Sequence, residues 1–374
     1  MKCALAEKGC GGCENLHRMY GDLLTEKQET FRRLFPECET IVGAENPCYY
    51  RNKVLRTFAN GRESLFAGFY RGGTHQILSV KRCLLENKRL GQIADIAVSL
   101  LAEMQLSAYR EDFGRGILRH MQLRIAPRSG QVLVTIITGG ESFPGGAEFA
   151  QKLMGKCPEV SGVTHCVNER RTNAVMGFKH KVLAGRDEIW DTLCGLKVCL
   201  TSRAFYQINS PQAEKMYRRA VEWAELTKED HVLDAYCGVG LIGQIAAGEA
   251  GRVTGVEIVK PSVECAQKSA RVNCIKNIDF ICADAPKALE GGKVKPTVIL
   301  VDPPRAGCDK KFLEAAVHAA PRSIVYISCN PETLRRDVDY LEKHGYVLER
   351  VQPYDLFPYT PHTEAVALLR KNKK

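Results

Sequence analysis

The second half of the chain alternates short apolar segments with amphipathic ones, and this alternation limits the fold more than any other feature. Apolar segments of strand length lie at 231–236, 252–257, 278–282, 297–301, 323–328, 346–353 and 364–369. Helical spacing fits between the first five of them. Strands that alternate with helices predict a parallel, doubly wound α/β sheet. The last two segments have no helical pattern between them, so we expect them to pair as an antiparallel edge.

The first half of the chain has a different texture, in which strands and turns prevail. Apolar and polar residues alternate over 121–125 and 132–136, on either side of a turn at 128–130, which predicts a β-hairpin. Other alternating stretches and helical patterns lie at 163–167, 174–178, 20–34 and 88–106. We therefore expect a smaller mixed α+β domain over residues 1–200 and a Rossmann-like domain with a mostly parallel seven-stranded sheet over residues 201–374.

Composition excludes several classes of protein. With 374 residues, 45% of them hydrophobic, the chain can bury a large core and is not disordered. No apolar run reaches the roughly 18–20 residues of a membrane span, and the first residues do not resemble a secretory signal. We expect a cytoplasmic monomer whose sixteen cysteines are buried apolar residues, metal ligands or nucleophiles. The net charge of +10 suits a polyanionic partner such as nucleic acid.

A glycine-rich turn follows the first strand of the predicted sheet. Gly238, Gly240 and Gly243 match G-x-G-x-x-G between a strand and a helix, which is the context of a nucleotide-binding turn. Glu257 ends the next strand, where an acid binds ribose hydroxyls. NAD and S-adenosylmethionine both fit these features. Asp234 ahead of the glycines favours S-adenosylmethionine, because an anion there repels a pyrophosphate but suits cationic amino and sulfonium groups.

The fourth predicted strand ends in Asp302-Pro303-Pro304-Arg305. The two prolines fix φ and stiffen the loop that carries Asp302. A ligand in this topology lies beyond the carboxyl ends of the strands, so Asp302 faces it. An acid followed by two prolines at this strand is common in nucleic-acid methyltransferases. It has no evident role in an NAD-dependent oxidoreductase, which is the weaker alternative.

A cysteine stands between the fifth predicted strand and the helix after it. This position turns Cys329 toward the ligand crevice, and the helix dipole is expected to lower the pKa of its thiol. A thiolate can add to C6 of a uracil, which makes C5 nucleophilic enough to attack the methyl group of S-adenosylmethionine. The C5 proton must then leave. Glu364, at the start of the last strand, is the expected base, and His362 is the alternative.

Four motifs, in this order, resemble those of the RNA (uracil-5-)-methyltransferases. They are D-x-x-C-G-x-G from Asp234, D-P-P-R-x-G from Asp302, S-C-N-P from Ser328 and D-x-F-P-x-T-x-H-x-E from Asp355. The resemblance implies a class I methyltransferase fold, with Cys329 as the nucleophile and Glu364 as the proton acceptor. It also implies that S-adenosylmethionine is contacted by Gln207 (within F-x-Q-x-N), Tyr236, Glu257 and Asp302.

Cysteines near the N-terminus predict a metal or cluster site. The spacing C-x6-C-x2-C is formed by Cys3, Cys10 and Cys13. A fourth thiolate is needed, and the residues alone leave open Cys38, Cys48 and Cys83. Spacing alone also fits a four-thiolate zinc site as well as a [4Fe–4S] cluster. The family resemblance singles out Cys83 and implies the cluster, as in the branch that acts on 23S ribosomal RNA.

Many members of the family begin with a small β-barrel that binds RNA. The residues before Cys3 leave no room for such a barrel, so we expect the first half of the chain to hold the RNA. The basic candidates for phosphate contacts are Arg51, Lys53, Arg56, Arg71, Lys81, Arg82, Arg170 and Arg171.

The sequence therefore predicts methyl transfer from S-adenosylmethionine to C5 of a uridine in 23S ribosomal RNA. The same chemistry on tRNA is the first alternative. A non-catalytic RNA-binding metal protein would leave Cys329 and Glu364 without a role. A cytosine-5 enzyme would need a second cysteine after Pro304, where Arg305 stands.

Overall fold

The computed structural model describes residues 3–62, 64–170, 174–289 and 294–372. The chain forms two compact units, and each is discontinuous in sequence. Unit 1 comprises Met1–Arg18, Asn46–Asp191 and Thr201–Arg203, and unit 2 comprises Met19–Glu45, Thr192–Leu200 and Ala204–Lys374. The predicted domain boundary at residue 200 stays a prediction. Each unit takes segments from both sides of it, since Met19–Glu45 belongs to unit 2 and Thr201–Arg203 to unit 1.

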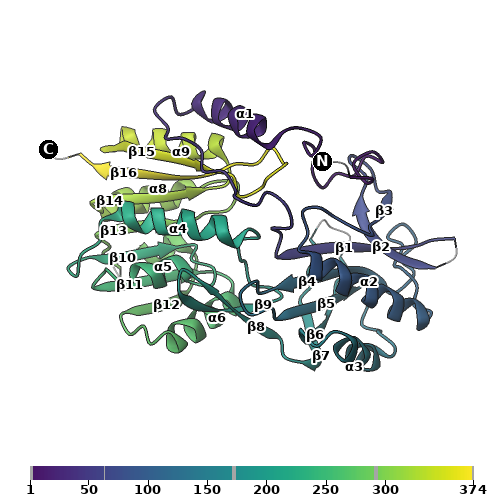
Figure 1. Ribbon diagram of the computed structural model, residues 1–374. Helices are drawn as coiled ribbons and strands as arrows, with labels where there is room; N and C mark the ends of the chain where they lie inside the picture. Colours follow the sequence, from purple (N-terminus) through teal and green to yellow (C-terminus); the bar gives the residue numbers. More distant parts are fainter. Residues whose placement is uncertain (1–2, 63, 171–173, 290–293, 373–374) are drawn as a thin grey trace. The chain divides into compact units, whose positions relative to one another are not determined.

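Unit 2 contains a seven-stranded sheet with the order β12-β11-β10-β13-β14-β16-β15 (Figure 1). Neighbours are parallel among β10 (His231–Ala235), β11 (Arg252–Glu257), β12 (Ile278–Cys282), β13 (Val298–Val301) and β14 (Ser323–Ser328). Strand β16 (Glu364–Lys371) is antiparallel to β14 and to β15 (Tyr346–Tyr354). The predicted parallel sheet with an antiparallel edge is confirmed, and the last strand enters the sheet next to β14.

Helices pack against this sheet, and those that follow parallel strands begin near the strands' carboxyl ends. They are α1 (Tyr20–Arg32), α4 (Ser210–Ala224), α5 (Leu241–Ala246), α6 (Lys260–Val272), α7 (Ala285–Leu289), α8 (Lys310–Ala319) and α9 (Pro331–Lys343). Residues of α1, α7, α8 and α9 share one buried core with the sheet, including Phe31 and Phe312. Helix α4 begins one residue before the predicted Pro211, with Asn209 as its N-cap residue.

The segment after α1 runs beside the edge strand β15. The backbone N–H of Glu39 donates to Val351 O at 2.8 Å, and that of Val42 donates to Pro353 O at 2.9 Å. The N–H of Asp355 in turn donates to Val42 O at 3.0 Å. The N-terminal segment thus pairs with the edge of a sheet whose strands lie some 300 residues later in the chain, which explains its place in unit 2.

Unit 1 contains a second seven-stranded sheet, in the order β3-β2-β1-β4-β5-β6-β7. The strands are β1 (Lys53–Asn60), β2 (Leu65–Tyr70), β3 (Ile77–Ser79), β4 (Leu118–Ile125), β5 (Val132–Thr138), β6 (Val160–Val167) and β7 (Lys179–Gly185). Only β5 and β6 are parallel, joined through α3 (Gly146–Lys156). Helix α3 and α2 (Lys88–Glu103) pack over one face of this sheet. A hairpin of β8 (Glu188–Leu193) and β9 (Leu196–Thr201) forms a separate two-stranded sheet.

The predicted hairpin in unit 1 is confirmed as β4 and β5, but its half-buried character is wrong. All residues of both strands are buried, because the polar face is covered as well. Gln122 on that face donates to Ser202 O at 2.7 Å. The stretch 174–178 is not a strand. Its carbonyls are bound by side chains instead, since Asn168 Nδ2 donates to Ala174 O at 2.6 Å and to Val175 O at 2.9 Å.

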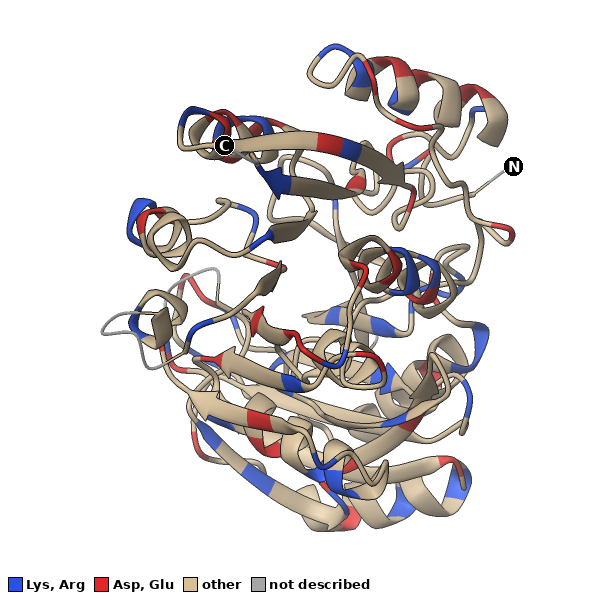
Figure 2. Ribbon diagram, turned by 90° about the vertical axis from the view of Figure 1, so that its left-hand side faces the viewer, with Lys and Arg blue, Asp and Glu red and all other residues tan. Residues whose placement is uncertain are grey.

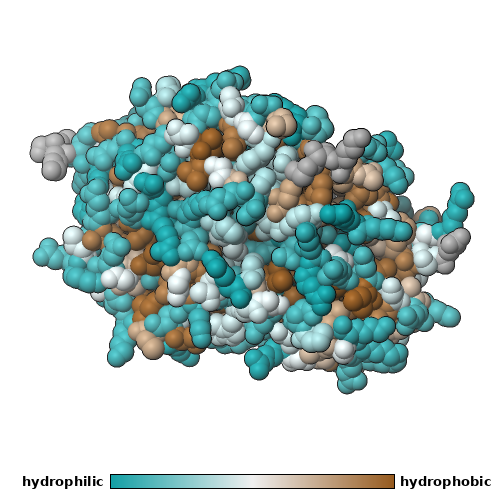
Figure 3. All heavy atoms as spheres, in the orientation of Figure 1, coloured by the Kyte–Doolittle hydropathy of each residue, from teal (hydrophilic) through white to brown (hydrophobic). Residues whose placement is uncertain are grey.

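Acidic and basic residues are interspersed along the helices (Figure 2). On the face drawn in Figure 3, hydrophobic residues form scattered patches among hydrophilic ones. Within the described parts of the chain, no helix has the length and apolar character needed to cross a membrane.

Candidate active site and cysteine pocket

The glycine-rich turn joins β10 to α5 and is held by two carboxylates. Asp234, 1% exposed, accepts a hydrogen bond from the N–H of Gly243 on Oδ2 at 2.8 Å. Its other oxygen, Oδ1, has no partner among the described residues. Glu257 accepts from the N–H of Gly238 at 3.0 Å and from that of Val259 at 2.7 Å. A carboxylate has about four acceptor positions, so Glu257 retains capacity for hydroxyl donors.

The turn needs glycine at position 240 for two reasons. Its φ of +71° lies in the left-handed region that L side chains rarely adopt. A Cβ there would also lie 2.4 Å from the ring of Phe280, so the backbone packs directly on a side chain of β12. Tyr236 has a positive φ of 60°, and its half-buried ring lies 5.4 Å from that of Phe312. The predicted residues Asp234, Tyr236, Gly238, Gly240 and Glu257 therefore converge at the end of β10 and β11.

Three predicted residues meet at the carboxyl ends of the next strands. The register of β14 and β16 pairs Ser328 with Ala365, so Cys329 lies opposite Glu364. Glu364 is 2% exposed, and its Oε2 has no partner among the described residues. Burial and the neighbouring charge of Asp302 raise the pKa of Glu364 to about 8, and burial raises the pKa of Asp302 to about 7. A carboxyl of this kind is a comparatively strong base once it is ionised.

The pKa expected for Cys329 is corrected by the structure. Burial and the nearby charges of Glu364 and Asp302 raise it to about 11, and Arg305 opposes this shift only in part. The N-terminus of α9 therefore does not produce a thiolate in the free protein. A cation bound beside Asp302 would offset the two acids and favour ionisation of the thiol.

Tyr217 on α4 is a site residue that the sequence reasoning assigned only to helix packing. It is 6% exposed and hydrogen-bonds the side chain of Gln207, which is 4% exposed. Burial and the charges of Asp302 and Glu364 raise the pKa of Tyr217 well above its ordinary value. Tyr217 thus hydrogen-bonds Gln207 and lies near enough to Asp302 and Glu364 to feel their charges. Helical spacing gave no signal for this role, because a tyrosine on the apolar face of an amphipathic helix is typical of core packing.

Lys27 on α1 is a second residue that the sequence reasoning missed. Its ammonium donates to Asp355 Oδ1 at 2.7 Å, to His362 O at 2.7 Å and to Phe357 O at 3.3 Å. Tyr20 Oη donates to the other oxygen of Asp355 at 2.8 Å. Burial lowers the pKa of Lys27, and Asp355 offsets this effect. The loop that leads into the predicted base is therefore fixed by a helix at the other end of the chain.

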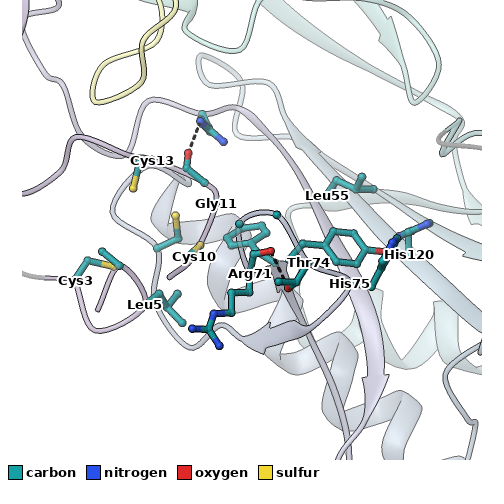
Figure 4. Close-up of a pocket in the computed structure, with 18 of the residues that line it drawn as sticks. Cys3, Leu5, Cys10, Gly11, Cys13, Leu55, Arg71, Thr74, His75 and His120 are labelled. Carbon is teal, nitrogen blue, oxygen red and sulfur yellow. Dashed lines mark hydrogen bonds between the residues drawn. The ribbon is translucent and has the colours of Figure 1, made fainter. Parts of the chain in front are cut away.

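The four predicted cysteine ligands line one pocket of unit 1. This cavity, of about 690 Å³, is bordered by Cys3, Cys10, Cys13 and Cys83. Figure 4 shows Cys3, Cys10 and Cys13 gathered at one end of it. Backbone pairing brings these segments together. Cys10 and Arg71 form an isolated antiparallel β-bridge, and the backbone just after Cys83 hydrogen-bonds that of residues 49–51. Burial, with the charges of Cys83, Cys10 and Cys3, raises the pKa of Cys13 to about 11.

Backbone N–H groups and one cation face these sulfurs. The N–H of Leu85 donates to Cys83 Sγ at 3.4 Å. Arg51 lines the pocket, donates to Gly12 O at 3.2 Å and opposes the raised pKa of Cys10 and Cys83. Across the described residues, no compact group of three or more His, Cys, Asp or Glu side chains is arranged as a ligand set for a metal ion. The [4Fe–4S] site therefore remains a proposal.

The other two candidates for the fourth thiolate have different surroundings. Cys38 belongs to unit 2, where it is buried in the core and accepts a hydrogen bond from Gln28 Nε2 at 3.1 Å. Cys48 lies in unit 1 but not among the residues that line the pocket. Of the three, Cys83 is the one that shares the pocket with the N-terminal cysteines.

The predicted RNA-contacting residues divide by exposure. Arg56 is fully buried and forms ion pairs with Glu86 at 2.8 Å and Asp95 at 3.0 Å, so its prediction as a phosphate contact is wrong. Arg51 faces the cysteine pocket, and burial lowers the pKa of Lys53 to about 8. The exposed candidates are Arg71, Lys81, Arg82 and Arg170. Arg171 lies outside the described residues.

The sheet order and the residues at its strand ends are those of an α/β methyltransferase. Comparison with known proteins identifies the family. Residues 178–372 match the family described as tRNA (uracil-5-)-methyltransferase. A crystal structure of the Pyrococcus abyssi tRNA (uracil-54, C5)-methyltransferase in complex with S-adenosyl-L-homocysteine is similar, with a TM-score of 0.81 and 25% identity. That similarity covers 96% of this chain and 86% of the other.

Curated relatives are similar over nearly the whole chain. An uncharacterized RNA methyltransferase from Caldanaerobacter subterraneus subsp. tengcongensis is 37% identical over 99% of this chain and 84% of its own length. One from Halalkalibacterium halodurans is 36% identical over 96% of this chain and 81% of its own. The chain therefore belongs to the tRNA (uracil-5-)-methyltransferase family.

Proposed function

We propose that the protein transfers a methyl group from S-adenosylmethionine to C5 of a uridine in 23S ribosomal RNA. The observation that carries the reaction type is the pairing of Cys329 with Glu364 across two neighbouring strands, with a buried carboxylate oxygen that has no partner among the described residues. A nucleophile at the end of one strand and a base at the start of its antiparallel neighbour lie side by side, so together they can reach the two adjacent carbons of one pyrimidine ring. Asp302, Gln207 and the turn around Gly238 are proposed to hold S-adenosylmethionine.

The reaction requires these groups in a fixed order. Cys329 loses its proton to water, and its sulfur bonds to C6 of the uracil, which moves electron density to C5. C5 attacks the methyl carbon, and S-adenosylhomocysteine leaves with the electron pair of the broken S–C bond. Glu364, in its ionised form, then takes the C5 proton, and the electrons of that bond re-form the C5–C6 double bond and expel Cys329. The raised pKa of Glu364, about 8, suits this proton acceptance.

We further propose that the cysteine pocket binds a [4Fe–4S] cluster. Support comes from four thiols on two segments that border one cavity, with backbone N–H groups aimed at Cys83 and Cys10. Hydrogen bonds to sulfur and a nearby cation stabilise the negative charge of cluster thiolates, and Arg51 supplies the cation. Such a cluster would be structural, because its ligands tie the N-terminal segment to residue 83 within unit 1.

A tRNA substrate is the second candidate. It is favoured by the similar Pyrococcus abyssi structure, which is that of a tRNA (uracil-54, C5)-methyltransferase. The cysteine set favours ribosomal RNA, because the resemblance to the 23S branch rests on those residues. The two candidates share the chemistry and differ only in the RNA that is bound.

The first experiment incubates purified protein and labelled S-adenosylmethionine separately with 23S ribosomal RNA and tRNA that lack 5-methyluridine. We expect label in the 23S RNA as 5-methyluridine, located by digestion and mass spectrometry. Label in tRNA alone would transfer the assignment to the second candidate. Label in neither RNA would contradict the proposed function.

The second experiment separates the catalytic roles. Cys329→Ala should give neither product nor covalent species, because C5 is never activated. Glu364→Gln should accumulate protein bonded to methylated RNA, since loss of a general base typically slows a step by about 10²–10⁴. Cys274→Ala, at an exposed cysteine of unit 2, is the matched control and should behave as wild type. Product formation by Cys329→Ala would refute the mechanism.

A further inference from the structure

Two phenylalanines in loops of unit 1 are exposed to an unusual degree. Phe113, in the loop before β4, is 61% exposed, and Phe178, in the loop before β7, is 76% exposed. Each carries an arginine over its ring: Arg110 lies 4.4 Å from the centroid of Phe113, and Arg170 lies 4.4 Å from that of Phe178. Exposure of a large apolar ring to water costs free energy. Two exposed phenylalanines, each with an arginine over its ring, therefore indicate a binding surface.

One buried arginine ties the two loops together. Arg119, 4% exposed, donates to Asn168 O at 2.6 Å and to Arg170 O at 2.9 Å, at the start of one loop. Its other nitrogen pairs with Glu111, which is next to Arg110 in the other loop. Arg119 therefore joins the two loops that carry the arginine–phenylalanine pairs, and we call Arg110, Phe113, Arg170 and Phe178 together the Phe113/Phe178 surface.

A cavity of about 250 Å³ adjoins this surface and is itself aromatic. It is lined by Tyr70, His75, Tyr109, Glu111, Arg119 and His120, among other residues. Tyr70 is 41% exposed, and His75 meets its ring edge-on at 6.4 Å. His75 and His120 lie together at the end of the larger pocket away from the cysteines (Figure 4).

The charge around the two loops favours an anionic partner. Residues 109–120, together with the described residues of 168–181, contain six basic side chains against three acidic ones. Arg119 is paired with Glu111 and Lys179 with Glu141, so neither pair adds net charge. The other basic side chains are Arg110, Arg115, Arg170 and Lys181, against Asp112 and Glu169. The exposed guanidinium groups of Arg110 and Arg170 can reach phosphates while they remain over the rings.

We propose that the Phe113/Phe178 surface binds single-stranded RNA by stacking unpaired bases on its two phenylalanine rings, with Arg110 and Arg170 beside the backbone phosphates. Single strands are recognised in this way because every base presents a flat π face, whereas a duplex hides its faces in the stack. The adjoining cavity is of a size and composition suited to one extruded base. This inference rests on the proposed function and adds the form of RNA that unit 1 receives.

The test measures binding of the intact protein to an unstructured 12-nucleotide RNA and to the same sequence as a duplex. Base–aromatic stacking is strong enough that Phe178→Ala and Phe113→Ala should each weaken single-strand binding by about 5- to 150-fold. Duplex binding should change less than twofold. Phe178→Trp, which keeps an aromatic face, should restore wild-type affinity. Val182→Ala, at an exposed apolar residue of β7, is the matched control and should bind as wild type.

The salt dependence separates the rings from the arginines. Phe178→Ala should leave the slope of log K against log salt unchanged, because a ring contacts no phosphate. Arg170→Ala should flatten it by about 0.7, the value for one phosphate contact on a single strand. Circular dichroism spectra and melting temperatures of all variants show whether each remains folded.

Two outcomes would overturn the inference: wild-type single-strand affinity in both phenylalanine variants, or equal loss for single strand and duplex. Failure of the proposed function has a different signature. If the wild-type protein methylates no RNA but binds the single strand through Phe113 and Phe178, the surface stands and the reaction does not. If it methylates uridine while both variants bind normally, the reaction stands and the surface does not.

Discussion

Replacing Lys27 by methionine tests how the loop before β16 is held. Lys27 is 7% exposed and donates to the side chain of Asp355 and to the carbonyls of Phe357 and His362. Methionine keeps the apolar stem but leaves the Asp355 carboxylate, 1% exposed, without its cation. Removal of one partner of a buried pair typically costs about 3–5 kcal/mol. Since Tyr20 still donates to Asp355, we expect the lower end, about 3 kcal/mol.

The assay is urea unfolding of wild type, Lys27→Met and the double variant Lys27→Met/Asp355→Asn. The double variant should regain at least half of the lost stability, because no unpaired charge is then buried. Methyl transfer is measured in parallel. The single variant should accumulate covalent protein–RNA adduct, since the loop positions Glu364, the proposed base. A loss below about 1 kcal/mol, or a double variant no more stable than Lys27→Met, would refute this account of the loop.

Further predictions concern the cofactor sites and the buried acids. Protein purified without oxygen should contain about four irons per chain; Cys83→Ser should lower the iron content and Cys48→Ser should not, whereas stoichiometric zinc would contradict the cluster. Binding of S-adenosylmethionine at pH 7 should release protons, because a sulfonium beside Asp302 lowers its raised pKa of about 7; calorimetry in two buffers measures this, and S-adenosylhomocysteine should release fewer. The raised pKa of Glu364 means that its contribution to stability falls as pH rises from its unfolded value toward about 8, so Glu364→Gln should raise the melting temperature more at pH 8 than at pH 5. Gly240→Ala should weaken S-adenosylmethionine binding and destabilise the protein by at least about 1–2 kcal/mol, the cost of the left-handed conformation, measured by titration and urea unfolding.

Much of the fold of unit 2 could be predicted because its signals are local. Strands β11, β12 and β14 begin and end at the predicted residues, since each is a short apolar run bounded by polar or turn residues. The carboxyl ends of parallel strands meet at one edge, so Asp234, Glu257 and Asp302 could be assigned to one site from their positions alone. The placement of Cys329 opposite Glu364 needed one more fact, the register of β16 beside β14.

Other features depend on contacts between distant parts of the chain. The stretch 174–178 alternates like a strand, yet its carbonyls bind the side chains of Asn168 and, at Met176, Arg170. The sequence predicted Arg56 to be a surface cation, whereas tertiary packing buries it in ion pairs with Glu86 and Asp95. A local pattern records periodicity, but it does not record which partner a side chain meets.

The sequence by itself determined the order of the strands and helices in the second half of the chain, the acids at the strand ends, and the residue types of the proposed nucleophile and base. Only the tertiary structure decided that α1 packs in unit 2 and that Lys27 fixes the loop before Glu364. It also reversed the expected pKa shift of Cys329. The physical reason is the same throughout: secondary structure follows from neighbours in the chain, whereas burial, ion pairing and electrostatic shifts follow from neighbours in space.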